Sequence, residues 1–306
     1  MASVLIITHL LCALHLGNAK HPEKPERLSV ITTRLEQMQH LSWQGATEIN
    51  IEHLYRAHDK QFVDNLLSKE MIEETAYIDA DTFISQGSIL AAKLASGALI
   101  QAVDEVMENK FKHVFCAIRP PGHHATYDQA MGFCLFNNIA IGALYAKEKY
   151  KLNRIAIVDF DVHHGNGTED ILKRHEGFLY ISSHGSPLYP GTGLSSSNDT
   201  ILNVPMLSRT GSHEFKRIYT EQILPKLLNF NPELIFISAG FDAHEKDPLG
   251  NLRLRANDYQ WITERIVDVA EATCNGKIIS TLEGGYDLEA LANSVEAHVM
   301  GLQKDM

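Results

Sequence analysis

The stretch Ile155-Ala156-Ile157-Val158-Asp159-Phe160-Asp161-Val162-His163-His164-Gly165-Asn166-Gly167 decides the fold predicted from this sequence. It begins with four apolar residues, two of them adjacent and β-branched, which is typical of a strand buried on both faces of a parallel sheet. In open α/β sheets, chemistry gathers beyond the carboxyl ends of the strands. Residues i and i+2 of an extended segment point to the same side, so Asp161 and His163 can converge on one cation. Their oxygen and nitrogen ligands suit Zn²⁺, although polar residues here could equally cap the next helix.

Composition describes an ordinary soluble globular protein. The chain has 306 residues, 44% of them hydrophobic and 21% charged, enough for one large α/β domain or two small ones. A formal net charge of −11 disfavours direct binding to nucleic acid. Four cysteines without paired spacing predict a reducing compartment, here the cytoplasm, and argue against a cysteine zinc site.

Neither a membrane span nor a signal peptide is predicted. No apolar run is long enough to cross a bilayer. Residues 4–16 are apolar enough to resemble a signal segment, but no Lys or Arg precedes them and His9 and His15 interrupt them. A strand followed by a loop is the preferred interpretation.

Strands and helices alternate along the chain, without a linker or repeat. This alternation predicts a single domain over residues 1–306, built on a doubly wound, mostly parallel sheet with helices on both faces. The predicted strands cover residues 4–8, 52–57, 113–118, 155–158, 178–182, 201–204, 234–238 and 277–282. The predicted helices cover about residues 27–38, 58–68, 88–106, 139–149, 168–175, 214–228, 258–270 and 288–302.

Polar residues follow several of these strands and are expected to share one sheet edge: His123, His124, Asp159, Asp161, His163, Asp242 and Tyr286. Three protein ligands and a water make the catalytic form of a zinc site, and Asp161, His163 and Asp242 supply three. His123 or His124 could then act as general base, with Asp159 orienting one imidazole. Tyr286 could donate to an oxyanion, so the set describes hydrolysis of an amide.

The motifs that carry these residues resemble those of the zinc-dependent histone deacetylase superfamily. They are Arg119-Pro120-Pro121-Gly122-His123-His124-Ala125, residues 159–167 of the opening stretch, Ala239-Gly240-Phe241-Asp242 and Glu283-Gly284-Gly285-Tyr286. The segments His21-Pro22-Glu23-Lys24-Pro25-Glu26-Arg27 and Tyr189-Pro190-Gly191-Thr192-Gly193 resemble the family as well. The match runs from near residue 8 to about residue 290 and looks like the class II branch with its bacterial amidohydrolase relatives.

The resemblance implies a zinc-dependent deacetylase fold and a role for each matching residue. Asp161, His163 and Asp242 would hold one Zn²⁺, and His124 would be the general base and then the acid. His123 paired with Asp159 would add electrostatic stabilisation, Asn166 would orient His124, and Tyr286 would bind the substrate carbonyl. Other residues would hold the substrate or a structural K⁺: Gly132, Phe133, Tyr189 and Asp81 around the acyl-lysine, Arg27 near an acetate exit, and Asp159, Asp161, His163, Ser182 and Ser183 around potassium. The expected substrate is an acylated lysine in a protein or peptide, and hydroxamate inhibitors are expected to bind the zinc.

Two departures from the family concern the mouth of the site. Relatives often carry His-Pro where this chain has His9-Leu10, and His-Asp where it has His15-Leu16. Both positions are expected near the rim. From the residues alone, Arg27 could be a surface residue or could face an anion; the resemblance favours the second.

Three other functions compete with that of a lysine deacetylase. An acetylpolyamine deacetylase is disfavoured because Leu249 stands where polyamine-selective relatives carry Glu. An arginase-like binuclear manganese enzyme needs a carboxylate two residues after the histidine ligand, and position 165 is glycine. A non-catalytic reader of acetylated ligands would lack a metal ligand or the tyrosine, and none is missing.

Overall fold

The centre of the fold is one eight-stranded parallel sheet. The computed structural model describes residues 4–196 and 198–304. Its strands lie in the order β2-β1-β5-β10-β9-β6-β7-β8, and every neighbouring pair is parallel. The bounds are β1 Val4–Thr8, β2 Leu41–Gly45, β5 His113–Ala117, β6 Ile155–Asp159, β7 Phe178–Ser186, β8 Ile201–Leu207, β9 Leu234–Ala239 and β10 Ile278–Leu282. The predicted doubly wound parallel fold is confirmed.

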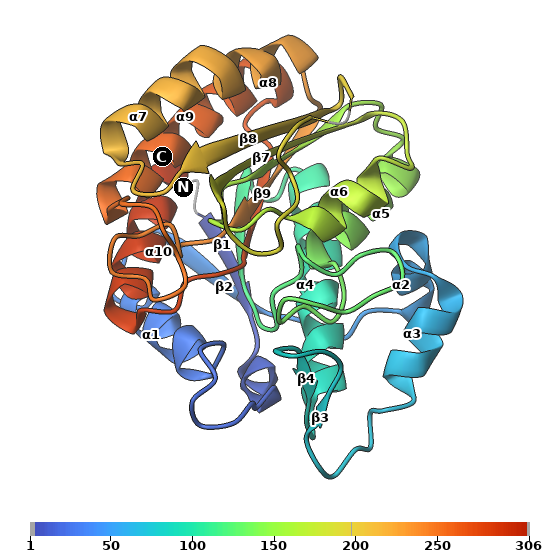
Figure 1. The fold of residues 1–306 in the computed structure, drawn as a ribbon. Helices are drawn as coiled ribbons and strands as arrows, with labels where there is room; N and C mark the ends of the chain where they lie inside the picture. Colours follow the sequence, from blue (N-terminus) through green and yellow to red (C-terminus); the bar gives the residue numbers. More distant parts are fainter. Residues whose placement is uncertain (1–3, 197, 305–306) are drawn as a thin grey trace.

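The four central strands explain the continuous apolar runs of the sequence. Every residue of β5, β10, β9 and β6 is buried, because helices cover both faces of the sheet there. In Figure 1, α4 (Ser88–Met107) and α5 (Asn138–Tyr150) lie on one side, while α9 (Ala256–Cys274) and α10 (Leu288–Leu302) lie on the other. Parallel strands end at the same edge, so the loops after these four strands meet.

The remaining helices pack around the helices on the two faces of the sheet. Helix α10 packs against α9 and α1, and α5 packs against α4 and α2. A two-stranded hairpin lies apart from the main sheet. These elements are α1 Glu26–Leu35, α2 Ile51–Ala57, α3 Lys60–Leu67, α6 Asn166–Leu172, α7 Ser212–Ile218, α8 Leu224–Phe230, β3 Ala76–Tyr77 and β4 Phe83–Ile84.

Some local predictions are wrong. Residues 52–57, predicted as a strand, belong to helix α2, because the Asn50 side chain caps Glu52 N and Leu54 and Ala57 are buried one turn apart. The predicted loop after the first strand contains a 3₁₀ helix, η1 (Leu10–Leu14). Edge strand β2 was not predicted.

The predicted helix over residues 214–228 is interrupted. Helix α7 runs into a π-helical turn, η2 (Tyr219–Ile223), before α8 begins. Pro225 lies in the first turn of α8, where a missing backbone N–H is tolerated.

Two further observations concern the whole described chain. Within residues 4–196 and 198–304, no helix is both long and apolar enough to cross a bilayer. The four cysteines are free and buried.

Candidate active site

The four central strands deliver the predicted site residues to one edge of the sheet. His123 and His124 follow β5, Asp159 ends β6 and Asp161 and His163 come just after it. Asp242 follows β9 and Tyr286 follows β10. Because β5, β10, β9 and β6 are neighbours, residues far apart in sequence become adjacent in space.

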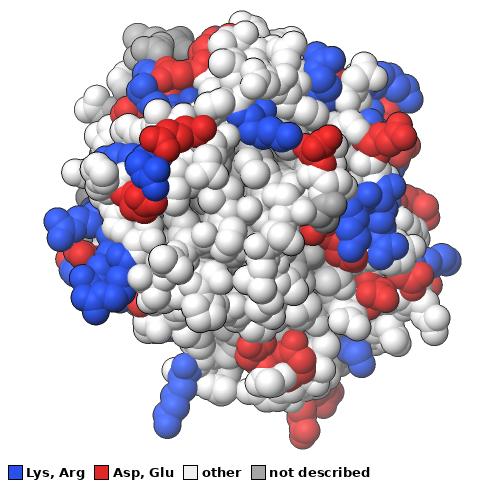
Figure 2. Space-filling model, turned by 45° about the horizontal axis from the view of Figure 1, so that its top comes forward, with Lys and Arg blue, Asp and Glu red and all other residues white. Residues whose placement is uncertain are grey.

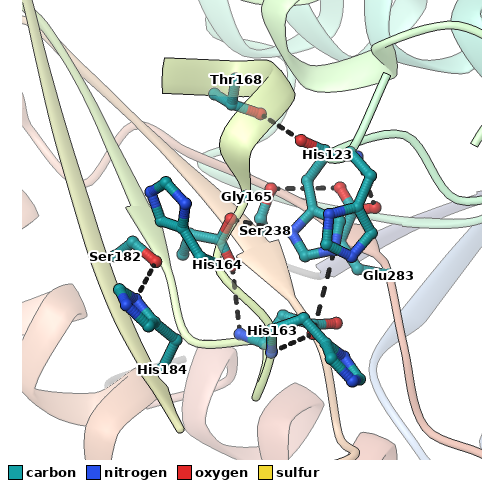
Figure 3. A network of polar contacts seen from close by, with 12 residues as sticks. His123, His163, His164, Gly165, Thr168, Ser182, His184, Ser238 and Glu283 are labelled. Atoms are coloured by element: carbon teal, nitrogen blue, oxygen red, sulfur yellow. Dashed lines mark hydrogen bonds and ion pairs between the residues drawn. The ribbon is translucent and has the colours of Figure 1, made fainter. Parts of the chain in front are cut away.

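Asp161, His163 and Asp242, here named the ligand cluster, offer ligand atoms that all lie within 4.8 Å of one another. His163 Nδ1 lies 3.1 Å from Asp161 Oδ1 and 3.1 Å from Asp242 Oδ2. Backbone amides hold both carboxylates: Gly284 N donates to Asp161 Oδ2 at 2.8 Å, and Val162 N donates to Asp242 Oδ1 at 2.9 Å. Figure 3 shows His163 within this network of polar contacts. Two anchored carboxylate groups therefore converge with an imidazole.

His163 supplies positive charge between the two carboxylates of the ligand cluster: burial lowers its pKa, but Asp161 and Asp242 outweigh this and raise the pKa to about 10. Asp161 and Asp242 are fully buried. Burial and then the nearby Asp161 raise the pKa of Asp242 to about 7. Burial opposes ionisation of Asp161 too, but His123 and His163 outweigh it and hold its pKa below the ordinary value. The donor set of two carboxylates and one imidazole fits Zn²⁺, whose charge would take the place of the proton on His163.

The two adjacent histidines have different partners. His123 Nδ1 lies 3.0 Å from Asp159 Oδ2, whereas His124 Nδ1 lies 2.8 Å from Asn166 Oδ1. Burial lowers the pKa of His123, but Asp159 and Asp161 outweigh it and raise the pKa to about 10. Burial, followed by the charges of His123 and His163, holds the pKa of His124 well below 6.5. One imidazole is thus built to be charged and its neighbour to be neutral.

A pocket of about 210 Å³ leads to these groups. Tyr189 packs edge-on against His124 with ring centroids 5.1 Å apart, and Phe133 packs edge-on against Tyr286 at 5.8 Å. Burial keeps the pKa of Tyr286 well above 10, so its hydroxyl stays protonated. The lining residues are Asp81, His124, Gly132, Phe133, His163, Leu188, Tyr189, Leu249 and Tyr286. The four residues expected around the acyl-lysine are among them, as is Leu249, which was also expected to contact the substrate.

Glycines form the walls against which the polar side chains rest. A Cβ at Gly240 would lie 2.0 Å from Asp161 Oδ2, and one at Gly284 would lie 2.1 Å from Asp242 Oδ2. At Gly165 it would lie 2.2 Å from Asp159 Oδ2, and at Gly132, whose φ is +54°, 2.5 Å from the His124 ring. The motif glycines are therefore required by space.

Arg27 is not a surface residue: its side chain is fully buried. It forms an ion pair with Glu23 at 3.0 Å, and Arg119 contacts the same carboxylate at 2.5 Å. Arg27 Nε also donates to Gly285 O at 2.7 Å, and its guanidinium lies 4.9 Å from the centroid of the Tyr286 ring. Glu23, Arg27 and Arg119, here named the arginine cluster, lie directly behind the candidate site.

The residues predicted to hold potassium lie on or just after two neighbouring strands, β6 and β7. Asp159 on β6 is paired with Ser182 on β7. The Ser182 hydroxyl lies 2.9 Å from His184 Nδ1, and the Ser183 hydroxyl lies 2.6 Å from the Tyr219 hydroxyl.

Of the two unusual leucines, Leu10 is not among the residues that line the pocket. It is 90% exposed and lines a separate cavity of about 450 Å³ together with Trp43. That Leu10 shapes the entrance of the site stays a prediction. Leu16 is exposed, and its backbone N donates to Ser85 Oγ at 3.1 Å.

Sequence reasoning missed several residues that shape the site. Glu283 accepts from the backbone N of Gly122 at 2.7 Å and of His123 at 3.1 Å, so β10 holds the histidine loop; Figure 3 shows Glu283 beside His123. Asp247 accepts from Tyr286 N at 2.7 Å. The only sequence signal was their place inside the quoted motifs or next to Leu249.

Comparisons with known proteins agree with this geometry. The model of the histone deacetylase domain matches residues 21–302. The chain belongs to the histone deacetylase family. This membership supports a deacetylase, a hydrolase of amide bonds.

Individual relatives align with most of this chain. It is 37% identical to the type-2 histone deacetylase 2 of Dictyostelium discoideum over 98% of its own length, but it spans only 21% of that protein. It is 35% identical to a probable deacetylase of Archaeoglobus fulgidus, covering 93% of this chain and 81% of the relative. The solved HDA15 HD domain superposes with a TM-score of 0.93 at 33% identity, covering 99% of this chain and 89% of that one.

Proposed function

We propose that the protein is a zinc-dependent lysine deacetylase, which removes acetyl or another short acyl group from the side-chain amine of lysine in proteins or peptides. The observation that carries this proposal is the convergence of the ligand cluster, His124 and Tyr286 at the base of one narrow pocket. A single zinc, when bound by Asp161, His163 and Asp242, would polarise the amide carbonyl and activate a water.

His124 is the proposed general base. Because its Nδ1 faces Asn166 Oδ1, the Nδ1–H donates to that oxygen and Nε2 carries the lone pair. The depressed pKa of His124 keeps it neutral and able to accept the proton of the attacking water. His124 then returns this proton to the leaving lysine amine, so the products are the free amine and the carboxylic acid.

His123 and Tyr286 are the proposed charge stabilisers. His123, held by Asp159, presents a positive imidazolium beside the reacting centre. The protonated Tyr286 hydroxyl donates to the carbonyl oxygen as it gains negative charge. Arg27 is proposed to face the route by which acetate leaves, because it packs against the far side of Tyr286.

The pocket walls support an acyl-lysine substrate. Phe133 and Tyr189 supply two aromatic surfaces for the aliphatic stem of lysine, and Gly132 lies against the His124 ring. Asp81 at the mouth would accept hydrogen bonds from the substrate backbone. Leu249 offers no charge to a polyamine, which favours a peptide over acetylspermidine.

The proposal also covers a second ion, the cellular compartment and nucleic-acid binding. A structural K⁺ would lie among Asp159, Asp161, His163, Ser182 and Ser183. Free, buried cysteines are compatible with the cytoplasm. On the face drawn in Figure 2, Lys and Arg are interspersed with Asp and Glu rather than gathered in a stripe that could follow a phosphate backbone.

The test compares initial rates on acetyl-, propionyl- and butyryl-lysine peptides with rates on acetylputrescine and acetylspermidine. We expect the peptides to be hydrolysed faster. A hydroxamate should abolish this activity. In a separate experiment, removing the metal with a chelator should abolish the activity and adding zinc should restore it. Faster turnover of acetylspermidine would favour the polyamine alternative. Binding of acetyl-lysine peptide without any hydrolysis would favour a non-catalytic reader.

A further inference from the structure

Tyr180 is a buried polar residue that the mechanism above does not use. It lies on β7, the strand that pairs with β6, and its side chain is fully buried. Its hydroxyl lies 2.9 Å from Asp159 Oδ2 and 3.0 Å from Gly165 O. A tyrosine hydroxyl has one proton, and a charged acceptor makes the stronger hydrogen bond, so this proton points to the carboxylate.

Asp159 Oδ2 is therefore shared by two donors. His123 Nδ1 approaches it at 3.0 Å and the Tyr180 hydroxyl at 2.9 Å, while Asp161 N donates to the other oxygen, Oδ1, at 3.1 Å. Both oxygens of the buried carboxylate are thus fixed in direction. Without the hydroxyl, Oδ2 would keep one of these two donors, and the carboxylate could turn away from His123.

Gly165 closes this arrangement from the third side. A Cβ there would lie 2.2 Å from Asp159 Oδ2, 2.3 Å from the Tyr180 hydroxyl and 3.1 Å from His123 Nδ1. The φ of Gly165 is −75°, which any residue adopts, so space is the reason for glycine at this position. Figure 3 shows Gly165 lying next to His123.

We propose that Tyr180 is a positioning residue for the deacetylase reaction: its hydroxyl, confined by Gly165, fixes the Asp159 carboxylate toward His123 and so sets the imidazole beside the reacting centre. The proposal rests on the proposed function, because it assumes that His123 stabilises charge during hydrolysis. Tyr180 touches neither the substrate pocket nor the ligand cluster, so its effect passes through Asp159.

The decisive variant is Tyr180→Phe, which removes one oxygen and keeps the buried ring. Outer partners of catalytic groups typically contribute about 10–100-fold, and we expect kcat to fall about 10-fold with KM and zinc content unchanged. The matched control is Tyr145→Phe: Tyr145 is also buried and donates to a carboxylate, Asp104, at 3.0 Å, but on α5. A kcat within about twofold of wild type for Tyr180→Phe, or a loss equal to that of Tyr145→Phe, would overturn the proposal.

A second variant pushes on the same carboxylate without changing Tyr180. Gly165→Ala should lower kcat at least as much as Tyr180→Phe. Gly211→Ala is its control, because a Cβ there would meet nothing closer than Arg253 O at 3.9 Å. Equal activity of the two alanine variants would contradict the tight fit around Asp159.

A spectroscopic measurement separates this proposal from the proposed function. In ¹⁵N-histidine-labelled protein, the Nδ1 proton of His123, assigned by its loss in His123→Ala, should change its chemical shift in Tyr180→Phe and keep it in Tyr145→Phe. An unchanged signal would refute the Tyr180–Asp159–His123 link even in an active enzyme. If wild type fails to hydrolyse acyl-lysine while the signal shifts as expected, the proposed function fails and the structural link stands.

Discussion

The arginine cluster and the ligand cluster are both buried groups of charges, but they are balanced in different ways. In the arginine cluster one carboxylate, Glu23, lies between two guanidinium groups. The excess positive charge is taken up by backbone carbonyls: Arg119 donates to Cys12 O and His15 O, and Arg27 donates to Gly285 O. That cluster is complete within the protein.

The ligand cluster has two carboxylates, and the protein answers them with an imidazole: Asp161 and Asp242 outweigh burial and raise the pKa of His163 to about 10. Its carboxylates, on Asp161 and Asp242, face one imidazole. Backbone amides also donate to the carboxylate oxygens, and burial and the neighbouring Asp161 raise the pKa of Asp242. The difference lies in the donor atoms: carboxylates that converge with an imidazole can bind a cation, whereas a carboxylate enclosed by guanidinium groups, which have no acceptor atom, has a structural role.

The largest expected effect concerns the ligand cluster. Asp161→Ala should abolish zinc binding and lower kcat about 10³-fold or more, because several kcal/mol of transition-state stabilisation go with the metal. Metal content by mass spectrometry and peptide turnover measure both effects. Asp64→Ala, which removes a half-exposed carboxylate, is the control and should keep both. A variant that still titrates with one zinc would count against the ligand set.

The arginine cluster should respond in stability instead. Glu23→Gln would leave two buried guanidinium groups without a counter-charge and should lower the free energy of unfolding by about 3–5 kcal/mol. Glu148→Gln is the matched control, because that exposed glutamate pairs with Arg56 at the surface and should cost at most about 1 kcal/mol. Denaturant unfolding measures both, and equal losses would erase the distinction between a closed buried cluster and a surface pair.

The same glutamate gives a pH dependence of known sign. Burial raises the pKa of Glu23, but Arg119 and Arg27 outweigh it and lower it from 4.5 to about 2. A carboxyl with a lowered folded-state pKa stabilises the fold above its unfolded pKa and loses that contribution as the pH falls. Between pH 4.5 and about 2, wild type should therefore lose more stability than Glu23→Gln. Parallel Tm-against-pH curves for the two proteins would show the interpretation to be wrong.

Tyr286 lies where the two clusters meet, so its variant separates them. Tyr286→Phe keeps the ring under the Arg27 guanidinium and removes only the hydroxyl. Stability and zinc content should stay unchanged, while kcat falls about 10²-fold or more, the size expected for one lost oxyanion donor. Near-normal turnover would refute the role of the hydroxyl.

The smallest expected effect has a sign that depends on the metal. Asp242→Asn removes one of two buried like charges, so the metal-free protein should become more stable by about 1–2 kcal/mol. The same substitution should weaken zinc binding, so that added zinc stabilises the variant less than wild type. Thermal unfolding with and without zinc measures both, and a loss of stability in the metal-free variant would contradict a dominant repulsion between Asp161 and Asp242.

The parts of the molecule that follow local rules were predictable. Buried strands such as residues 155–158 and 234–238 carry continuous apolar runs, and parallel strands must end at one edge. The residues after β5, β6, β9 and β10 were therefore brought together as expected. Helix α2 was not predicted, because seven residues give too short a pattern and the decisive signal is the cap from Asn50.

The partners of buried charges were beyond sequence reasoning. Glu23 and Arg119 are 96 residues apart, and Glu283 and Gly122 are 161 apart. Neither pairing leaves a periodic or spacing signal. A positive charge at the start of a helix, such as that of Arg27, is unfavourable for the helix dipole, and only the fold shows that Glu23 pairs with it.

Gly165, Gly240 and Gly284 give the acidic side chains room by having none of their own. A single methyl group at any of these three positions would displace a carboxylate oxygen on which the site depends. Every other amino acid is therefore excluded there. Leu188 and Leu249 at the pocket mouth face no such constraint. Divergence toward new acyl donors should therefore accumulate at the mouth, while the floor of the pocket stays unchanged.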